Sequence, residues 1–447
     1  MKSKILFVIT AAALLSAPAL RAETPEQKAE RMEWFAQAKL GIFIHWGIYS
    51  KGIDSESWPI FNGRMTIPEY MKQCDSFTAD RYDPAYWAQL IRESGARYTV
   101  ITTKHHDGFA LWDTRAGDLS AVKSSPARRD LIAPFVEEVR KQGIKLGFYF
   151  SLIDWPREDY PNVLRSGPER YDIEKEPARW QHFLDFNTAQ LRELNLTWKP
   201  DLFWFDGDWE FSAEQWRADD IVADLRKTNP QVVINSRIQG RGDYDTPELG
   251  VPVVRPQSQW WETCMTMNDS WAYRENDIYY KSPMVLLRMF VDCISLGGNL
   301  LLDIGPRVDG TIPDEQVAIL REFGRWTTKH AEAIYGTRAG IPAGHVQAYT
   351  SLNKQGDILY LYLPYRPTGP IELKGLKNIV NRIRVVGTDR QLGCIRYNDI
   401  SWSEVPGVYY IDVPEDALDE RITVLALELD QPVQLYRGAG QIISVNE

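Results

Sequence analysis

The sequence predicts an α/β protein: a (β/α)8-like TIM-type barrel followed by a C-terminal antiparallel β-sandwich. Between about residues 38 and 335, short apolar runs alternate with amphipathic helical segments, the pattern of a parallel sheet covered by helices. Seven or eight such units fit this region, which is typical of a TIM-type barrel. After about Gly336, short strands follow one another with only turns between them.

Each apolar run of the first region ends in a polar, often ionisable residue. Because catalytic groups of a TIM-type barrel lie at the C-terminal ends of its strands, we expect these residues to converge on one pocket. A doubly wound open sheet is the alternative, although no Gly-x-Gly-x-x-Gly motif follows the first strand. The predicted strands are residues 39–44, 97–103, 144–150, 202–205, 232–235, 257–261 and 299–304.

Helices are predicted between these strands. Residues 180–194 keep a 3.6-residue apolar period, and Pro84 precedes a helix over residues 85–93. Asp130 is the predicted N-cap of a helix that Gly143 closes. A further apolar helix over residues 285–296 ends at Gly297. Such helices would cover the outside of the sheet.

The C-terminal region is expected to be a small sandwich over residues 337–447, joined to a barrel over residues 23–336 by a linker at about residues 336–344. Its apolar segments are too short and too closely followed by turn residues to be helices. The predicted strands are residues 348–350, 358–363, 383–386, 408–411 and 422–427.

Residues 1–22 are typical of a secretory signal peptide, with a buried N-terminal helix as the alternative. Lys2 and Lys4 precede a short apolar run, and small residues at 17–19 or Ala22 offer a cleavage site. The remaining chain has no apolar run long enough to span a bilayer. We therefore expect an exported protein without a membrane span, periplasmic or extracellular.

The charge and cysteine content exclude some function classes. The formal charge is −10, or −13 without Lys2, Lys4 and Arg21, which disfavours binding to nucleic acid or anionic membranes. The four cysteines lack metal-site spacing and are interpreted as buried thiols, with disulfides left open. The sixteen tryptophans can stack on sugar rings or fill cores. An oligomer is left open.

Two carboxylates at predicted strand ends are candidate catalytic groups. Asp206 ends a strongly apolar strand, where a carboxylate is costly unless paired or functional; an ordinary turn residue is the alternative. Glu262 follows Trp260 and Trp261, and an apolar setting raises a carboxyl pKa toward the range of a general acid. Two such carboxylates in one barrel indicate glycoside hydrolysis.

Three histidines also lie at predicted strand ends: His45, His105 and His106. These histidines do not have the HxH or HExxH spacing of common metal-binding motifs, so a metal site is disfavoured. Hydrogen bonding of neutral imidazoles to sugar hydroxyls fits better, and a structural histidine is the alternative for His45. Arg237 ends another predicted strand and belongs to the same expected pocket.

Five segments in order resemble the glycoside hydrolase family 29 α-L-fucosidases, and the sandwich after them fits the family's architecture. The resemblance implies a retaining exo-acting fucosidase that hydrolyses terminal α-L-fucosides of fucosylated oligosaccharides or glycoconjugates through a covalent intermediate, without cofactor or metal. The segments are residues 43–47, 104–109, 203–209, 235–237 and 261–264, the last followed by Ser270-Trp271-Ala272-Tyr273.

The resemblance also implies roles for individual residues. Asp206 matches the nucleophile and Glu262 the acid/base, with their carboxyl groups roughly 5–5.5 Å apart. Arg237 matches an arginine that would keep Asp206 ionised. The implied substrate-binding residues are His45, His105, His106, Trp58, Trp204 and Tyr149; the role of Glu56 is open, because Ser57 separates it from Trp58 where the family often has Glu directly before Trp.

Three alternatives remain at this point. One is a glycoside hydrolase acting on α-L-galactosides, because a hydrophobic pocket rejects one added hydroxyl only modestly. The second is a sugar-binding protein without catalysis. The third is a metal-dependent hydrolase that uses His45, His105 and His106.

Overall fold

The computed structural model describes residues 23–440, and the predicted leader lies outside that range. Seven parallel strands form one sheet in the order β5-β4-β3-β2-β1-β7-β6. The described residues contain no helix that is both long and apolar enough to cross a membrane. The strands are β1 (Leu40–Ile44), β2 (Tyr98–Lys104), β3 (Lys145–Ser151), β4 (Leu202–Asp206), β5 (Val233–Ile234), β6 (Glu262–Met265) and β7 (Asn299–Ile304).

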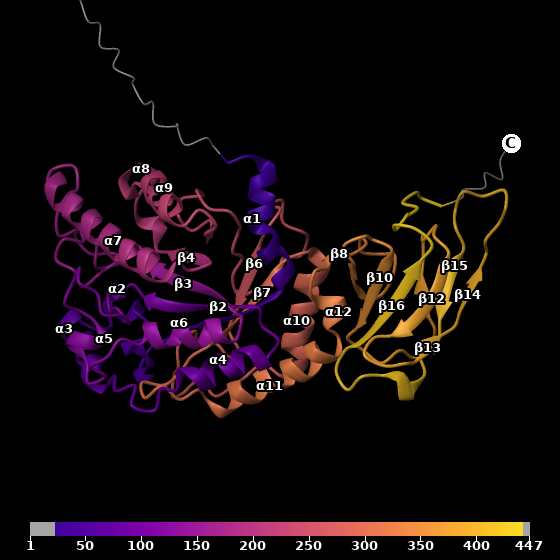
Figure 1. Cartoon of the computed structure of the whole chain (residues 1–447), viewed down its shortest axis with the longest axis horizontal. Helices are drawn as coiled ribbons and strands as arrows, with labels where there is room; N and C mark the ends of the chain where they lie inside the picture. Colours follow the sequence, from indigo (N-terminus) through magenta and orange to yellow (C-terminus); the bar gives the residue numbers. More distant parts are fainter. Residues whose placement is uncertain (1–22, 441–447) are drawn as a thin grey trace, which may run out of the picture.

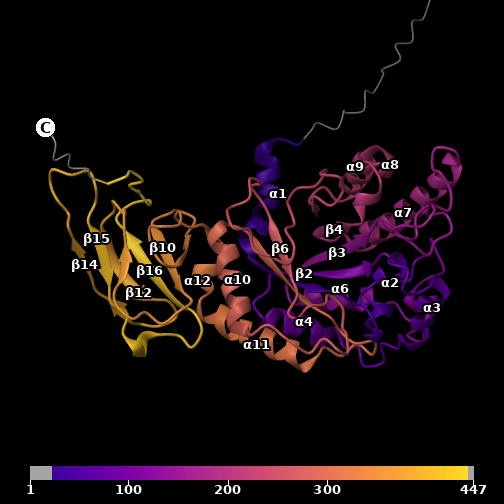
Figure 2. The ribbon, with the colours of Figure 1, turned by 180° about the vertical axis from the view of Figure 1, so that it is seen from behind.

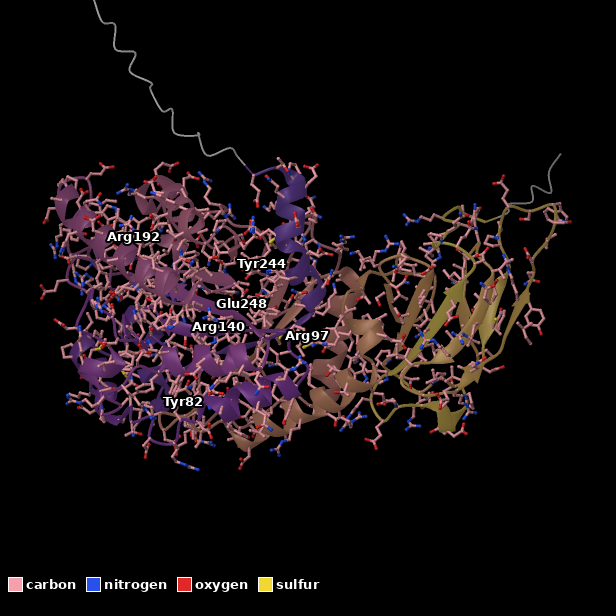
Figure 3. All side chains as sticks on the ribbon, viewed as in Figure 1. Tyr82, Arg97, Arg140, Arg192, Tyr244 and Glu248 are labelled. Carbon is pink, nitrogen blue, oxygen red and sulfur yellow. The ribbon has the colours of Figure 1, made fainter. Side chains whose placement is uncertain are left out.

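A short segment, Tyr244 to Glu248, closes the sheet into a ring. On one side it bridges to the end of β5, through Tyr244 and Asn235. On the other it bridges to β6, through Asp245 with Trp261 and Glu248 with Cys264. Both sets of bridges are parallel, so this segment occupies the eighth position of the barrel. Figure 3 labels Tyr244 and Glu248 at its two ends.

The predicted strand over residues 257–261 is wrong, and the error changes the position of Glu262. Strand β6 begins at Glu262 instead of ending before it, and Glu262 pairs with Asn299 at the start of β7. Glu262 therefore lies at the N-terminal end of its strand, whereas Asp206 is the last residue of β4. Of these two carboxylates, Asp206 alone has the position expected of a catalytic group in this fold.

The helices confirm most of the predicted boundaries. The N-cap of α6 is Leu131 and not the predicted Asp130, although the Asp130 carboxylate accepts hydrogen bonds from the amides of Ile132 and Ala133, each 2.8 Å. Gly297 ends α10 with a φ of 88°, a conformation that favours glycine. The helices are α1 (Pro25–Ala38), α2 (Trp58–Phe61), α3 (Ile67–Met71), α4 (Pro84–Glu93), α5 (Ala121–Ser124), α6 (Ile132–Lys141), α7 (Pro177–Trp198), α8 (Ala213–Trp216), α9 (Ala218–Thr228), α10 (Pro283–Leu296), α11 (Asp314–Lys329) and α12 (Ala331–Ile334).

Helix α1, which the sequence analysis did not predict, packs its buried side chains into the interior of the barrel. Met32 and Phe35 belong to the same buried cluster as Tyr98, Trp204 and Tyr244. The Phe35 ring lies 5.9 Å from that of Tyr98 and 4.4 Å from that of Tyr244. The barrel is therefore filled with side chains from α1 at one end to the aromatic residues near its opposite, C-terminal end.

The C-terminal strands form an antiparallel sandwich of a six-stranded and a three-stranded sheet, with strand orders β13-β12-β16-β10-β9-β8 and β11-β15-β14. A separate apolar cluster lies between the two sheets. The sandwich prediction is thus confirmed, although β8, β11, β13 and β14 were not predicted. The strands are β8 (Arg338–Ala339), β9 (Tyr349–Leu352), β10 (Ile358–Leu363), β11 (Ile371–Leu373), β12 (Val380–Val385), β13 (Gln391–Leu392), β14 (Cys394–Tyr397), β15 (Val408–Ile411) and β16 (Thr423–Leu429).

The sandwich packs against one side of the barrel, beside α10, α11 and α12, as both Figure 1 and Figure 2 show. The contact combines apolar packing with specific polar bonds. Trp326 of α11 donates its indole N–H to the carbonyl of Ile422, and Lys329 pairs with the buried Asp419 at 2.7 Å. The sandwich therefore supports the outer helices of the barrel.

Candidate active site

A cavity of about 270 Å³ opens where the barrel strands end. Its walls come from β1 to β6 and the loops that follow them, and none of its lining residues belongs to the sandwich. Nine of the ten predicted site residues line it: His45, Glu56, Trp58, His105, His106, Tyr149, Trp204, Asp206 and Arg237. The tenth, Glu262, does not. The remaining lining residues are Phe43, Trp209, Glu248, Cys264 and Trp271.

Asp206 holds its carboxylate in this cavity through contacts to both oxygens. The Tyr149 hydroxyl donates to Oδ2 at 2.9 Å, and Nη1 of Arg237 donates to Oδ1 at 3.1 Å. Nε2 of His106 lies 3.6 Å from Oδ2. The chain can turn sharply after this residue because Gly207 has a φ of 82°, and a Cβ there would meet Ile153 at 2.8 Å.

Arg237 joins two carboxylates of the cavity. Beside its bond to Asp206, its Nη2 donates to Oε2 of Glu248 at 2.6 Å. Its guanidinium lies over the ring of Trp204, 4.5 Å from the centroid, and its Nε donates to Thr246. The guanidinium is thus held in one plane by the indole, with a carboxylate at each end.

Glu248 is the second carboxylate of the cavity, and the sequence analysis did not identify it. It is the last residue of the segment that closes the barrel, the position equivalent to Asp206 at the end of β4. Its side chain is 37% exposed, so it can meet a substrate and exchange protons with water. Glu248 therefore has the position expected of a proton-transferring group.

Glu262 lies below the cavity, inside the barrel. It is fully buried, and its oxygens accept hydrogen bonds from the Tyr98 hydroxyl and from Nε1 of Trp204, the latter at 3.0 Å. Burial raises its pKa to about 7, a value that suits a general acid. A general acid must first lie within hydrogen-bond distance of the substrate, however, and the structure places no part of this carboxyl group in the cavity.

The three histidines are all fixed through Nδ1. His45 pairs with Asp303 at 2.7 Å, His105 with the Ser57 hydroxyl at 2.6 Å and His106 with the Ser151 hydroxyl at 2.6 Å. Ser151 donates its own proton to the carbonyl of Ile153, so it accepts from His106. Nε2 of His106 is then an acceptor and has no partner among residues 23–440, which leaves it free for a ligand hydroxyl.

Burial keeps these imidazoles neutral. It lowers the pKa of His106 to about 3 and the pKa values of His45 and His105 well below their usual range, and neighbouring histidines act in the same direction. Within residues 23–440, no cluster of three or more His, Cys, Asp and Glu side chains is arranged to hold a metal ion. The geometry instead fits uncharged hydrogen-bonding partners.

Glu56 lies in the loop after β1, and Trp58 is the first residue of α2. Oε1 of Glu56 accepts the amide of Ala272 at 2.8 Å, so this buried carboxyl group ties that loop to the segment that carries Trp271. The Trp58 ring stacks on Trp209 with a centroid separation of 6.1 Å and makes an edge contact with His106. Both predicted residues therefore line the cavity, and Glu56 also connects two of its loops.

The cysteines near and far from the cavity are all unpaired thiols. Cys264 lines the cavity, Cys74 and Cys293 are buried elsewhere, and Cys394 is half-buried in the sandwich. The interpretation as buried thiols is confirmed for three of the four.

Comparison with known proteins gives one consistent family. The family profile described as Alpha-L-fucosidase matches residues 8–332. The tissue alpha-L-fucosidase of Mus musculus is 30% identical over 406 residues, which cover 83% of this chain and 85% of the mouse protein.

Solved structures agree with the family profile. Alpha-L-fucosidase isoenzyme 1 from Paenibacillus thiaminolyticus has a TM-score of 0.82 and 31% identity, covering 90% of this chain and all of that one. A GH29 alpha-L-fucosidase from Bacteroides thetaiotaomicron, trapped as a covalent intermediate with 2-fluoro-fucosyl fluoride, has a TM-score of 0.78 and 26% identity, covering 90% and 96% of the two chains.

Proposed function

Because the chain belongs to the alpha-L-fucosidase family, we propose that it hydrolyses terminal α-L-fucosides with retention of configuration, using Asp206 as nucleophile and Glu248 as general acid and base. The observation that carries this proposal is the pair of cavity carboxylates joined by one guanidinium, with Asp206 at 3.1 Å and Glu248 at 2.6 Å from Arg237. Glu262, the acid/base that the sequence favoured, is replaced because it does not reach the cavity.

In the first step, an Asp206 oxygen attacks the anomeric carbon while Glu248 gives its proton to the departing glycosidic oxygen. The bond to the leaving group breaks, and a covalent fucosyl-enzyme forms. In the second step, Glu248 removes a proton from water as that water attacks the same carbon and releases Asp206. Two inversions give net retention, and Glu248 ends as the protonated acid that began the cycle.

The surrounding side chains would orient both partners. Tyr149 donates to Oδ2 of Asp206 and so restricts the rotation of the nucleophile. Phe43 and Trp271 supply apolar ring surface for the sugar. A volume of about 270 Å³ leaves room for little more than one sugar ring, which supports removal of terminal residues from fucosylated oligosaccharides or glycoconjugates.

The histidines predict how KM depends on pH. Because the pKa of His106 is lowered to about 3, and those of His45 and His105 lie well below their usual range, the imidazoles stay neutral as pH falls from 7 to 5. Their protonation, and the loss of their acceptor nitrogens, would begin only at lower pH. We expect KM for an aryl α-L-fucoside to stay within about twofold over this interval. A tenfold rise in KM between pH 7 and 5 would contradict it.

The function itself is tested by following aryl α-L-fucoside hydrolysis with proton NMR. We expect the α-anomer of L-fucose to appear first and the β-anomer to follow by mutarotation. A first-formed β-anomer would indicate inversion, and a protein that releases no L-fucose would overturn the proposed activity. The same assay with an aryl α-L-galactoside measures the tolerance for a hydroxyl at C6.

We also propose that residues 1–22 direct export to the periplasm or beyond, because a positively charged start, an apolar run and small residues appear in that order. N-terminal sequencing of the protein recovered from the producing cell tests this. A mature protein that still begins at Met1 would overturn it.

A further inference from the structure

Glu262 is a buried carboxyl group that the proposed mechanism does not use. Its side chain is fully inaccessible, and within residues 23–440 it forms no ion pair. A buried carboxyl group without a cationic partner is costly, and burial raises its pKa to about 7. A glutamine or an apolar side chain could be buried here at a lower free-energy cost. The presence of a carboxyl group therefore indicates a function for it.

Its two hydrogen-bond partners differ in what they touch. Tyr98 lies within the barrel interior and is not among the cavity-lining residues. Trp204 belongs to the cavity wall: its Nε1–H donates down to Oε1 of Glu262 at 3.0 Å, while its ring stacks on Tyr149 at 5.6 Å and an interplanar angle of 19°. Among residues 23–440, the Glu262 carboxyl group therefore hydrogen-bonds to the cavity wall through Trp204 alone.

Trp204 in turn supports the group that joins the two reacting carboxylates. The Arg237 guanidinium lies 4.5 Å from the centroid of the indole and bonds Asp206 and Glu248. A carboxylate that accepts the indole N–H fixes the plane of the ring. When this carboxyl group is ionised, its charge also polarises the indole and strengthens the attraction of the ring face for a cation.

We propose that Glu262 is a positioning residue, which orients the Trp204 indole and, through it, holds Arg237 between Asp206 and Glu248. This inference rests on the proposed function, in which those two carboxylates react. The contacts run in one unbroken series from Glu262 to Trp204, to Arg237 and to the two carboxylates.

The test compares variants that remove one bond each. Glu262→Leu removes the acceptor for Trp204 and Tyr98 together, and Glu262→Gln keeps the shape and one acceptor oxygen. Tyr98→Phe is the matched control, because it removes a buried hydrogen bond of Glu262 without touching Trp204. Wild-type turnover is measured first on two aryl α-L-fucosides, one with a good and one with a poor leaving group, and thermal unfolding is followed for every variant.

We expect Glu262→Leu to lower kcat about 10- to 100-fold equally for both leaving groups, since a displaced guanidinium affects both chemical steps. Glu262→Gln should recover most of that loss, and Tyr98→Phe should stay within about threefold of wild type even where its melting temperature falls. Added azide should not restore the turnover of any Glu262 variant. In the double variant with Trp204→Phe, Glu262→Leu should add no further loss, because both changes remove the same hydrogen bond.

Each contrary result has a distinct meaning. A Glu262→Leu kcat within twofold of wild type overturns the positioning role, as does a multiplicative loss in the double variant. Rescue by azide would instead make Glu262 the acid/base. If Glu262→Leu does not fold, Glu262→Ala takes its place, both alone and together with Trp204→Phe. A wild-type protein that hydrolyses neither fucoside refutes the proposed function first, and the inference with it.

Discussion

Replacing Asp206 with alanine is expected to lower kcat/KM for an aryl α-L-fucoside by about 10³- to 10⁵-fold. The change removes the atom that forms the bond to the anomeric carbon, and the loss corresponds to roughly 4–7 kcal/mol of transition-state stabilisation. Steady-state hydrolysis of a fucoside with a good leaving group measures it. Of the changes considered, this one should have the largest effect.

Azide gives this prediction a second readout. In the space left by the Asp206 side chain, azide can attack the anomeric carbon directly, and the product should be the β-fucosyl azide of inverted configuration. Asp208 provides the matched control: it is two residues away, its carboxylate accepts the amide of Gln239 at 2.7 Å, and it does not line the cavity. Asp208→Ala should cost less than about tenfold. An Asp206→Ala protein that keeps a tenth of wild-type activity would contradict the assignment.

The second large effect is expected at Glu248. Glu248→Ala should lower kcat/KM by about 10²- to 10⁴-fold for a fucoside with a poor leaving group, which needs a proton, and far less for one with a good leaving group. Azide should accelerate turnover of the second substrate and yield the α-fucosyl azide of retained configuration, because azide needs no general base when it attacks the covalent intermediate.

A variant of Glu262 is the control that shows which of the two glutamates is the general acid and base. Glu262→Ala removes the carboxyl group that the sequence favoured, and it should show neither dependence on the leaving group nor rescue by azide. If the leaving-group dependence and the rescue belong to Glu262 instead, the structure-based choice of Glu248 is wrong. Measuring both variants with the same pair of substrates excludes differences in assay conditions.

Most of this site can be predicted from the sequence because the barrel brings the C-terminal ends of all its strands to one face. His45, His105, His106, Asp206 and Arg237 all follow apolar runs, and the structure brings all five to one cavity. Apolar parallel strands are easily recognised, and whatever follows them must lie at the same end of the barrel. Positions far apart in the chain could therefore be grouped without any knowledge of contacts.

Prediction from apolar runs fails where a strand of the barrel has no apolar run. The segment that ends at Glu248 reads Tyr244-Asp245-Thr246-Pro247-Glu248, and a proline with two polar residues does not resemble a strand. The predicted strand over residues 257–261 ends in the aromatic pair before Glu262, whereas β6 starts only at Glu262. The available signal was Glu248 itself, an acidic residue that follows Arg237 and the turn ending at Gly240.

The missed strands of the sandwich have a related cause. In β14 the residues alternate between half-buried and exposed, and this strand pairs only with β15 at the edge of the three-stranded sheet. Such short amphipathic edge strands lack the apolar character on which the prediction depended. Strands β10 and β16 lie at the centre of the other sheet, are mostly buried and were predicted.

The proposed mechanism depends most on Asp206 as a covalent nucleophile, and trapping of the glycosyl-enzyme tests this role directly. The protein is incubated with a 2-fluoro-fucosyl fluoride, which forms the glycosyl-enzyme quickly and releases it slowly, and is then digested and mapped by mass spectrometry. We predict a single 2-fluoro-fucosyl group on the peptide that contains Asp206, with activity lost in proportion to labelling. A label on any other residue, or full inactivation without a covalent label, would contradict it.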